Sequence, residues 1–386
     1  MKRSDIFDPS IKISFFSPVI TDEDKRAVLD ALNSTLLTDG PRLRQFEEEF
    51  AKFVGAKYAV GVSNATSALH LSLRALGIGK GDEVIVPDMT FVATANAVVL
   101  SGATPVFADI DEDTMNISPD SIKKNISPKT KTILPVHFAG LACNMTEIRS
   151  IARQNNLKIL EDCAHAIGTT WQKKHVGNFG DAGCFSFYPT KNMTTIEGGM
   201  VVTNSKRIAK YVMSARNHGL TKTLTQRYSH GKPWDYDMKE SGYNYRLDEI
   251  RSALGLSQLK LVKKLNEQRR KAFDYYNDGL RDIKGIITPQ SVQRGAHSHH
   301  LYILRIKDGL STSRDMVFAK LLKYGIKTSV HYKPLHRFTA FKKFVGKSSF
   351  THSEKLYREI ISLPFYPNIP RKHQDYVIES LRKIMS

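Results

Sequence analysis

The stretch DAGCFSFYPTKNMTTIEGGM, residues 181–200, decides the fold. An apolar run from Ala182 to Phe187 predicts a buried strand, and Met200 to Thr203 begins a second one. Pro189 marks a turn between them, and this turn carries Lys191. Burial lowers the pKa of a lysine, and a neutral amine can form a Schiff base with an aldehyde. An ordinary surface lysine is the alternative, since Lys and Arg together number 57.

Upstream of this stretch, predicted strands alternate with predicted helices. Strands are expected at 58–62, 83–86, 105–108, 132–136 and 157–160, and helices at 66–76, 91–101, 119–125 and 145–155. The alternation predicts an α/β protein with a largely parallel sheet covered by helices. Ligands bind such sheets at the carboxyl ends of the strands. Asp162 and Lys191 both fall at such ends or in the turns beyond them.

The flanking regions predict additional parts of the chain. Residues 1–20 are interpreted as an arm, followed by a helix capped by Thr21 and a second helix at 42–54. The polar segment 216–245 is too long for an ordinary connection, and we interpret it as a functional loop or an interface element.

The C-terminal part has a different pattern from the alternating region. A long helix at about 247–279 precedes it, and we interpret this helix as the domain hinge. Strands are then expected at 300–306 and 327–330, and helices at 314–324, 352–361 and 371–385. We therefore predict an arm at 1–20, a large domain at 21–255 and a small α+β domain at 256–386.

Composition narrows the class of protein. The 386 residues carry a net charge of +19, which favours anionic partners such as nucleic acid or a phosphorylated cofactor or substrate. The basic residues form no long block and no helix-turn-helix or zinc-finger pattern. Three cysteines without paired spacing argue against a disulfide framework and fit a reducing cytoplasm. No signal peptide or membrane-spanning run is apparent.

Four kinds of group in this chain match the needs of a pyridoxal 5′-phosphate site. Lys191 offers the amine, and Asp162 offers a carboxylate that keeps the ring nitrogen protonated. His165 is a candidate for the face or the phenolic oxygen of the cofactor, and Phe91 is a candidate for stacking on its ring. Each residue also has an ordinary interpretation: Asp162 as a helix cap, His165 as a structural histidine, and Phe91 as a core residue.

The phosphate group needs a cradle of donors. Thr66 and Ser67 open a predicted helix, where backbone N–H groups and the helix dipole favour an anion. Ser186, five residues before Lys191, adds a hydroxyl group. Plain capping of this helix by Ser63 or Asn64 is the alternative.

The chain resembles the sugar-nucleotide aminotransferases of the DegT or StrS family from about residue 13 to its C-terminus. The segments that carry the resemblance are SNATSALHL (63–71), PDMTFVATANAV (87–98), EDCAHAIG (161–168), SFYPTKN…EGGM (186–200) and GYNYRLDEIRSALGLSQL (242–259). The resemblance implies the fold-type I aminotransferase architecture, in which a mixed, mostly parallel seven-stranded sheet forms a large domain beside a smaller C-terminal domain. It also implies a homodimer with sites shared between subunits.

The resemblance also implies roles for individual residues. Lys191 would hold the aldehyde and move the proton, and Asp162 would pair with the ring nitrogen. The phosphate would be bound by Thr66, Ser67 and Ser186. Asn244 would reach the cofactor phosphate of the partner subunit. His331, in VHYKPLH, matches a segment that lines the sugar pocket, although a loop or strand-end histidine is the alternative.

We therefore predict transfer of an amino group from L-glutamate to a nucleotide-diphosphate 4-keto-6-deoxy sugar, in amino-sugar or polysaccharide biosynthesis. The segments WDYDM (234–238) and GYNYRL (242–247) look most like members that use UDP-linked N-acetylamino sugars; GDP- and dTDP-linked sugars remain alternatives.

Many members have glutamine where this chain has His165. Related dehydratases replace the lysine with histidine, so Lys191 favours transamination. A basic DNA-binding protein that retains the fold is the alternative from another class.

The segment HSHH (297–300) suggests a metal site at first sight. Because it leads into a predicted strand, alternate histidines are expected to face opposite sides of that strand. We therefore predict no metal ligands here.

Overall fold

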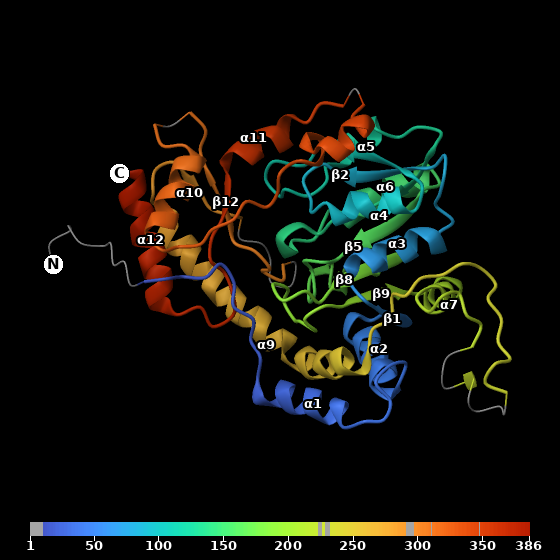
Figure 1. Ribbon diagram of the computed structural model, residues 1–386. Coiled ribbons are helices and arrows are strands. Elements are labelled where there is room, and N and C mark those ends of the chain that lie inside the picture. Colours follow the sequence, from blue (N-terminus) through green and yellow to red (C-terminus); the bar gives the residue numbers. More distant parts are fainter. Residues whose placement is uncertain (1–10, 223–225, 228–231, 291–296, 310, 347) are drawn as a thin grey trace.

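The computed structural model describes residues 11–386 except 223–225, 228–231, 291–296, 310 and 347 (Figure 1). Residues 1–10 of the predicted arm and parts of the predicted 216–245 segment therefore lie outside the described residues.

The large sheet has seven strands in the order β1–β9–β8–β5–β4–β2–β3. Their bounds are β1 (Tyr58–Val62), β2 (Glu83–Pro87), β3 (Thr104–Ala108), β4 (Thr130–Ile133), β5 (Lys158–Asp162), β8 (Ala182–Ser186) and β9 (Gly199–Thr203). Every neighbouring pair from β3 to β8 is parallel, whereas β9 runs antiparallel to both β1 and β8. This arrangement confirms the predicted mixed, mostly parallel sheet.

Helices cover both faces of this sheet (Figure 1). Their bounds are α1 (Asp22–Leu32), α2 (Pro41–Val54), α3 (Ala65–Ala75), α4 (Ala93–Leu100), α5 (Pro119–Lys124), α6 (Met145–Gln154), α7 (Lys206–Ala215) and α9 (Glu249–Leu280). In one hydrophobic core, α3, α4 and α7 pack on one face of the sheet. In two further cores, α2, α5, α6 and α9 pack on the opposite face. Along β8, Cys184 belongs to the first core and Phe185 to the second. Burial on both faces explains why these strands are apolar throughout.

Local sequence signals place the first helices where they were predicted. Thr21 Oγ1 accepts the backbone N–H of Asp24, and the Asp24 carboxylate accepts the backbone N–H of Thr21, which forms a capping box at α1. Pro41 occupies the first turn of α2, and Gly55 ends that helix with φ 74°. A positive φ favours glycine, so the helix stops at this residue.

Helix α9 runs from the large sheet to a second, smaller core (Figure 1). Asp248 caps it by accepting the backbone N–H of Arg251. Val262 packs in a core beneath the large sheet, whereas Phe273 and Tyr276 pack in the smaller one. One helix therefore contributes to both cores, and the domain boundary between residues 255 and 256 stays a prediction.

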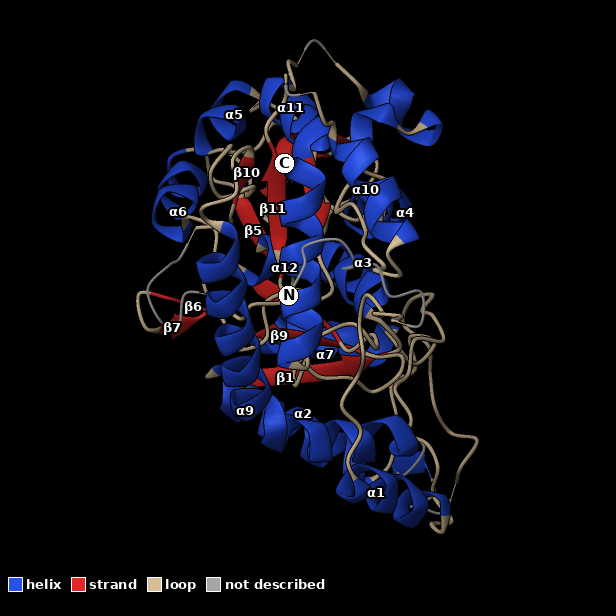
Figure 2. Ribbon diagram, turned by 90° about the vertical axis from the view of Figure 1, so that its left-hand side faces the viewer, coloured by secondary structure: helices blue, strands red, loops and turns tan. Residues whose placement is uncertain are grey.

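The smaller sheet contains β10 (Ile286–Ile287), β11 (Ile303–Ile306) and β12 (Ile360–Ser362), all antiparallel. Around it lie α10 (Arg314–Lys323), α11 (Thr351–Glu359) and α12 (Arg371–Met385), with 3-10 turns η2 (Leu335–Arg337) and η3 (Thr339–Phe344) nearby. A separate ribbon of β6 (Thr170–Trp171) and β7 (Lys174–His175) stands apart from both larger sheets (Figure 2).

The predicted strand at 327–330 is wrong. Within it, Ser329 exchanges two backbone hydrogen bonds with Ser362, an isolated bridge rather than a strand. Residues 360–362 pair with β11 instead, and the first two of them, Ile360 and Ile361, are fully buried. β-Branched side chains fit a buried strand, so the helix predicted at 352–361 ends at Glu359 instead.

Candidate active site

Lys191 lies in the loop that joins β8 to β9. The backbone N–H of Phe187 donates to Gly198 O and that of Thr195 donates to Phe187 O, so the two ends of the loop are tied together. Lys191 is partly buried. Burial lowers the pKa of its amine to about 8, against the opposing charge of Asp162. This shift brings a nucleophilic neutral amine within reach of neutral pH.

Asp162 ends β5 and lies in register with Cys184 of β8. Its Oδ2 accepts a hydrogen bond from Thr94 Oγ1 at 2.9 Å, and its Oδ1 accepts the backbone N–H of Ala164 at 3.0 Å. Burial raises the pKa of this carboxyl, while the charge of Lys191 acts in the opposite direction. The residues after Asp162 form turns and no helix, so the predicted alternative of a helix cap is wrong.

His165 is buried and contacts the rings of Phe138, His300 and Tyr332. Its Nδ1 accepts the backbone N–H of Ala139 at 3.3 Å, and its Nε2 lies 3.1 Å from the hydroxyl of Tyr332. Burial, and then the charge of Lys191, hold the pKa of His165 well below its usual range. Since Nδ1 accepts, the neutral ring carries its proton on Nε2 and donates it to Tyr332. The His300 ring packs 4.5 Å from the His165 ring, centroid to centroid.

The start of α3 meets the start of β9. A Cβ on Gly199 would lie 2.5 Å from the carbonyl of Asn64, so only glycine permits this approach. Ser186 lies in register with Gly199, which brings it to the same place. Asn64 caps the helix, because its Oδ1 accepts from the backbone N–H and the Oγ of Ser67. The capping alternative is therefore confirmed for Asn64; Thr66 and Ser67 remain in the first turn of α3.

Phe91 lies between β2 and α4, and its side chain is 55% exposed. The predicted alternative of a core residue is therefore wrong. Its ring centroid lies 5.9 Å from that of Tyr332. An exposed aromatic face beside the Lys191 region is suited to stacking on a planar ligand.

His331 is partly buried in the loop after β11 and α10. Its Nδ1 lies 2.8 Å from Ser362 Oγ, and its ring stacks on Phe15 at 5.5 Å. Burial, with the charge of Lys191 as a second cause, lowers its pKa to about 4. The histidine is therefore neutral at pH 7 and lies near enough to Lys191 to sense its charge, and its place in a sugar pocket stays a prediction.

Asn244 lies in an extended segment near the start of α3. The neighbouring Tyr243 and Tyr245 stack at 5.0 Å, and His70 packs against Tyr243. Asn244, between these two tyrosines in the sequence, pairs with Asn217 in an isolated bridge and is exposed.

Sequence reasoning missed Tyr332 and Thr94. Tyr332 adjoins His331 in VHYKPLH and contacts the rings of His165 and Phe91. The position next to a predicted site residue was a signal that could have found it. No local signal marks Thr94, because its contact with Asp162 spans 68 residues of sequence.

The segment HSHH precedes β11, which begins later than predicted, at Ile303, but its histidines face different sides as predicted. The rings of His297 and His299 stack at 4.4 Å, whereas His300 packs on His165. Among the described residues, a group with metal-ligand spacing is His137, Glu161 and Cys163. Its His137 and Glu161 atoms are engaged in hydrogen bonds with each other and with backbone N–H groups.

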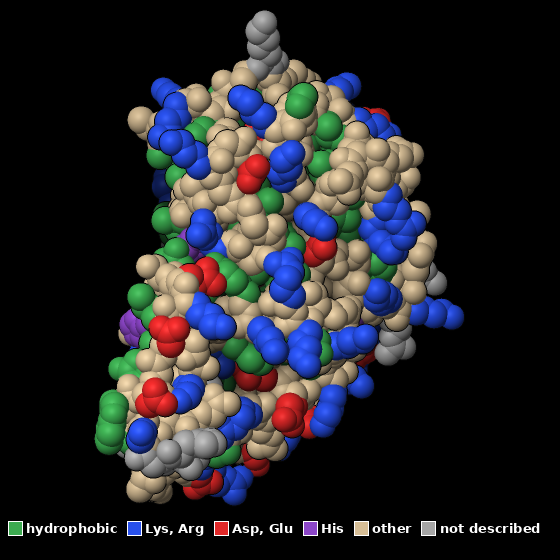
Figure 3. All heavy atoms as spheres, turned by 90° about the vertical axis from the view of Figure 1, so that its right-hand side faces the viewer, with side chains coloured by type: hydrophobic (Ala, Val, Ile, Leu, Met, Phe, Trp, Pro, Cys, Tyr) green, Lys and Arg blue, Asp and Glu red, His purple; other side chains and the backbone are tan. Residues whose placement is uncertain are grey.

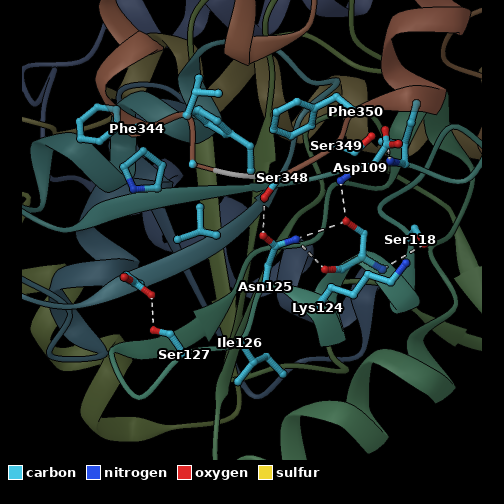
Figure 4. Close-up of a pocket in the computed structure, with 18 of the residues that line it drawn as sticks. Asp109, Ser118, Lys124, Asn125, Ile126, Ser127, Phe344, Ser348, Ser349 and Phe350 are labelled. Atoms are coloured by element: carbon cyan, nitrogen blue, oxygen red, sulfur yellow. Dashed lines mark hydrogen bonds between the residues drawn. The ribbon is translucent and has the colours of Figure 1, made fainter.

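A cavity of about 900 Å³ lies elsewhere, between β3, α5 and the segment that precedes α11 (Figure 4). Ser348 Oγ donates to Asn125 Oδ1 across it, and Phe350 forms part of its wall. None of the predicted site residues lines this cavity. The cavity is therefore separate from the Lys191 region.

The residues at the carboxyl ends of the sheet fit pyridoxal phosphate. They provide a lysine of lowered pKa, and a buried carboxylate with two hydrogen-bond donors among the described residues. They also provide an exposed aromatic ring and a helix N-terminus that the backbone of Gly199 approaches. The fold and this set of groups define a pyridoxal-phosphate-dependent sugar aminotransferase of fold type I. The chain belongs to the DegT/DnrJ/EryC1/StrS aminotransferase family, whose model matches residues 18–382.

Individual relatives agree with this assignment. The chain is 41% identical to the spore coat polysaccharide biosynthesis protein SpsC of Bacillus subtilis, over 95% of this chain and 96% of SpsC. Among solved structures, it is similar to Helicobacter pylori PseC, an aminotransferase involved in the biosynthesis of pseudoaminic acid. The TM-score is 0.91 and the identity 34%, with 97% of this chain and 99% of PseC covered.

A second solved relative is the putative sugar aminotransferase Spr1654 of Streptococcus pneumoniae, with 30% identity and a TM-score of 0.90 over 97% of this chain and 99% of Spr1654. It is known in a PLP form and a PMP form. These forms support pyridoxal phosphate, and its pyridoxamine form, as the cofactor of this chain.

Basic side chains are spread over the face shown in Figure 3, rather than gathered in a single stripe. Among the described residues, no helix is long and apolar enough to cross a membrane. The family assignment supports the predicted transferase over the DNA-binding alternative.

Proposed function

We propose that this aminotransferase moves the amino group of L-glutamate to a nucleotide-diphosphate 4-keto-6-deoxy sugar, and that a UDP-linked N-acetylamino sugar is its preferred substrate. The observation that carries the proposal is Lys191, a partly buried lysine with a pKa lowered to about 8 beside Asp162. The resemblance of residues 234–247 to members that use UDP-linked sugars supports the choice of substrate. The net charge of +19 suits a ligand that carries a pyrophosphate.

We assign the cofactor-binding residues from their positions. Pyridoxal phosphate, when bound, supplies an electron sink for a carbanion next to its ring. Asp162 would hold the protonated ring nitrogen, because its carboxylate has room for a further donor. Phe91 offers its exposed face to the ring. The phosphate would be held by Thr66, Ser67 and Ser186.

Lys191 is the proposed acid and base of both half-reactions. As a neutral amine it accepts the proton from the α-carbon of glutamate, and as an ammonium it returns a proton when the sugar is aminated. The product 2-oxoglutarate leaves before the sugar binds. His165 and His331 are neutral at this stage, since burial lowers the pKa of both. They therefore line the pocket without repelling the charged form of Lys191.

We further propose a homodimer in which Asn244 reaches the cofactor phosphate of the partner subunit. Asn244 is exposed, and its neighbours Tyr243 and Tyr245 stack on each other. Tyr188 and Ile196, which flank Lys191 in the same loop, are 46% and 63% exposed. Exposed apolar side chains of this kind suit a surface that another subunit covers.

The test of the substrate is a panel of UDP-, GDP- and dTDP-linked 4-keto-6-deoxy sugars, each with L-glutamate and the loaded enzyme. We expect 2-oxoglutarate and an aminated product, with the highest kcat/KM for a UDP-linked N-acetylamino sugar. A higher value for a GDP- or dTDP-linked sugar would overturn the choice of nucleotide. Release of an unaminated dehydrated sugar would instead support a dehydratase.

Mixing two inactive variants tests the shared site. A dimer of Lys191→Ala with Asn244→Ala contains one intact site only if Asn244 serves the partner subunit. We expect the mixture to recover activity that neither variant has alone. No recovery, with mixed dimers confirmed by mass spectrometry, would place Asn244 in its own subunit's site.

A further inference from the structure

His336, in η2, lies between two carboxylates. Its Nδ1 is 2.7 Å from Asp88 Oδ2, and its Nε2 is 2.7 Å from Glu354 Oε1. The ring stacks on Phe350 at 4.4 Å with an interplanar angle of 6°. Arg337 donates from Nε to Glu354 Oε1 and forms a further ion pair with Glu354 Oε2. We call Asp88, His336, Arg337 and Glu354 the His336 cluster.

Counting protons indicates the charge of this ring. A neutral imidazole has one N–H and one lone pair. If His336 were neutral, one of its nitrogens would face a carboxylate oxygen at 2.7 Å, lone pair against lone pair. An imidazolium donates to both carboxylates. With Arg337 beside Glu354, the cluster then holds two positive and two negative charges, and the fully buried Asp88 keeps a cationic partner.

The His336 cluster joins two segments that border the proposed site. Asp88 follows β2 and precedes Phe91 by three residues, whereas Tyr332 precedes His336 by four. Asp88 Oδ1 also accepts the backbone N–H of His336 at 3.0 Å, and Asp88 O accepts that of Leu335 at 2.7 Å. Where the segments meet, the Phe91 and Tyr332 rings are 5.9 Å apart.

We propose that His336 is a positioning residue, whose imidazolium form holds the Tyr332 segment against the Phe91 segment beside the active site. The proposal rests on the site assigned above, but the charge of His336 can be measured without catalysis. A loss of this charge removes a donor from one of the two carboxylates and loosens the attachment of residues 331–336. The substrate is then held less well, while the backbone hydrogen bonds of Phe187 and Thr195 that tie the Lys191 loop remain.

The pH dependence follows from the groups that face His336, which are Asp88 after β2, Glu354 on α11 and Arg337 on η2. Burial acts to lower the pKa of His336, but the hydrogen bonds and charges of Asp88 and Glu354 prevail and raise it above 6.5. Its stabilisation is therefore complete below about pH 6.5 and is lost as pH rises through the raised value. The hydrogen bond from Arg337 lowers the pKa of Glu354, so that carboxylate stays charged down to below pH 4.5.

The first test is ring-¹⁵N NMR of histidine-labelled holoenzyme, with the His336 signal assigned by its loss in His336→Gln. We expect a protonation midpoint above 6.5, with both ring nitrogens protonated below it, and a lower midpoint in Glu354→Gln. A midpoint at or below 6.5 would overturn the proposal. If His336→Gln does not fold, the shift in Glu354→Gln assigns the signal.

The second test separates positioning from general stability. In His336→Gln we expect cofactor loading to be unchanged, and kcat/KM for the sugar to fall about tenfold, within the range known for small misplacements of reacting groups. The alkaline decline of wild-type kcat/KM at the NMR midpoint should disappear. The control is His352→Gln, which replaces a histidine of α11 whose side chain is 49% exposed and lies near Glu112. Unchanged kcat/KM in His336→Gln, or the same alkaline decline in it, would refute the positioning role, whereas loss of cofactor loading would indicate a general structural role.

Discussion

Glu161 and Asp162 are consecutive residues at the end of β5, and both are buried, but their surroundings differ. Glu161 accepts hydrogen bonds from His137 Nε2 and from the backbone N–H groups of Gly177, Phe179 and Gly180. Asp162 accepts hydrogen bonds from Thr94 and Ala164 alone among the described residues. A carboxylate offers about four lone-pair positions. Glu161 is therefore saturated, whereas Asp162 can accept further donors.

The pKa shifts of the two carboxyls follow the same difference. Burial acts to raise both values. At Glu161 the hydrogen bonds, led by that of His137, prevail and lower the pKa. At Asp162 burial prevails and raises it. Burial alone therefore does not identify a functional carboxylate; spare acceptor capacity beside a reactive group does so better.

The largest loss of activity is expected from substitution of Lys191, whose charge influences Asp162. Lys191→Ala removes the amine that moves the proton, so amino transfer should fall at least about 10³-fold, within the range of general acid–base catalysis. The control is Lys206→Ala, an exposed lysine at the start of α7, which should remain active. A rate of the Lys191 variant within tenfold of the wild type would contradict the proposed role.

The next effect is the pH dependence of the reaction of Lys191 with pyridoxal phosphate. A pKa of about 8, instead of 10.5, gives Lys191 about 300-fold more neutral amine at pH 7. The rate at which cofactor-free protein captures pyridoxal phosphate should therefore rise with pH to a midpoint near 8. In Asp162→Asn the midpoint should fall further, because the carboxylate raises the pKa of the amine. A midpoint near 10.5 would show that the lysine is not desolvated.

Exchanging each carboxylate for an amide tests the comparison directly. Asp162→Asn should reduce kcat/KM about 100-fold, a loss typical of a removed electrostatic partner, and should leave folding nearly unchanged. Glu161→Gln should reduce the free energy of unfolding by about 3 kcal/mol, because its amide group would oppose buried N–H donors. Kinetics and urea unfolding of both variants provide the measurement. The reverse pattern would assign the functional role to Glu161.

The smallest effect concerns a neighbour of Asp162. Thr94→Val removes one of the donors to its carboxylate, and a hydrogen bond to a charged group contributes about 1.5–3 kcal/mol. We expect the catalytic rate to fall about tenfold, with activity restored in Thr94→Ser. Equal rates for the valine and serine variants would show that the hydroxyl has no part in holding Asp162.

The large sheet was predictable because its signals are local. Apolar runs between helix caps placed β5 and β8, and hence Asp162 and Lys191, close to their observed positions. The smaller sheet was harder to predict, because its three short strands resemble other segments in composition. Residues 327–330 were therefore predicted as a strand in place of β12. The contacts of Tyr332 with His165 and of His336 with Asp88 span 167 and 248 residues, so no local pattern indicates them. Their detection required the tertiary structure.

The central claim is that Lys191, beside an unsaturated Asp162, is the amine that holds the cofactor and takes part in the first half-reaction. Absorbance spectra of cofactor-loaded wild type, Lys191→Ala and Lys206→Ala, before and after L-glutamate, test it most directly. We predict a visible band in the wild type and the Lys206 variant that glutamate shifts to shorter wavelength, and no such band in the Lys191 variant. The same band with the same response in Lys191→Ala would contradict the account.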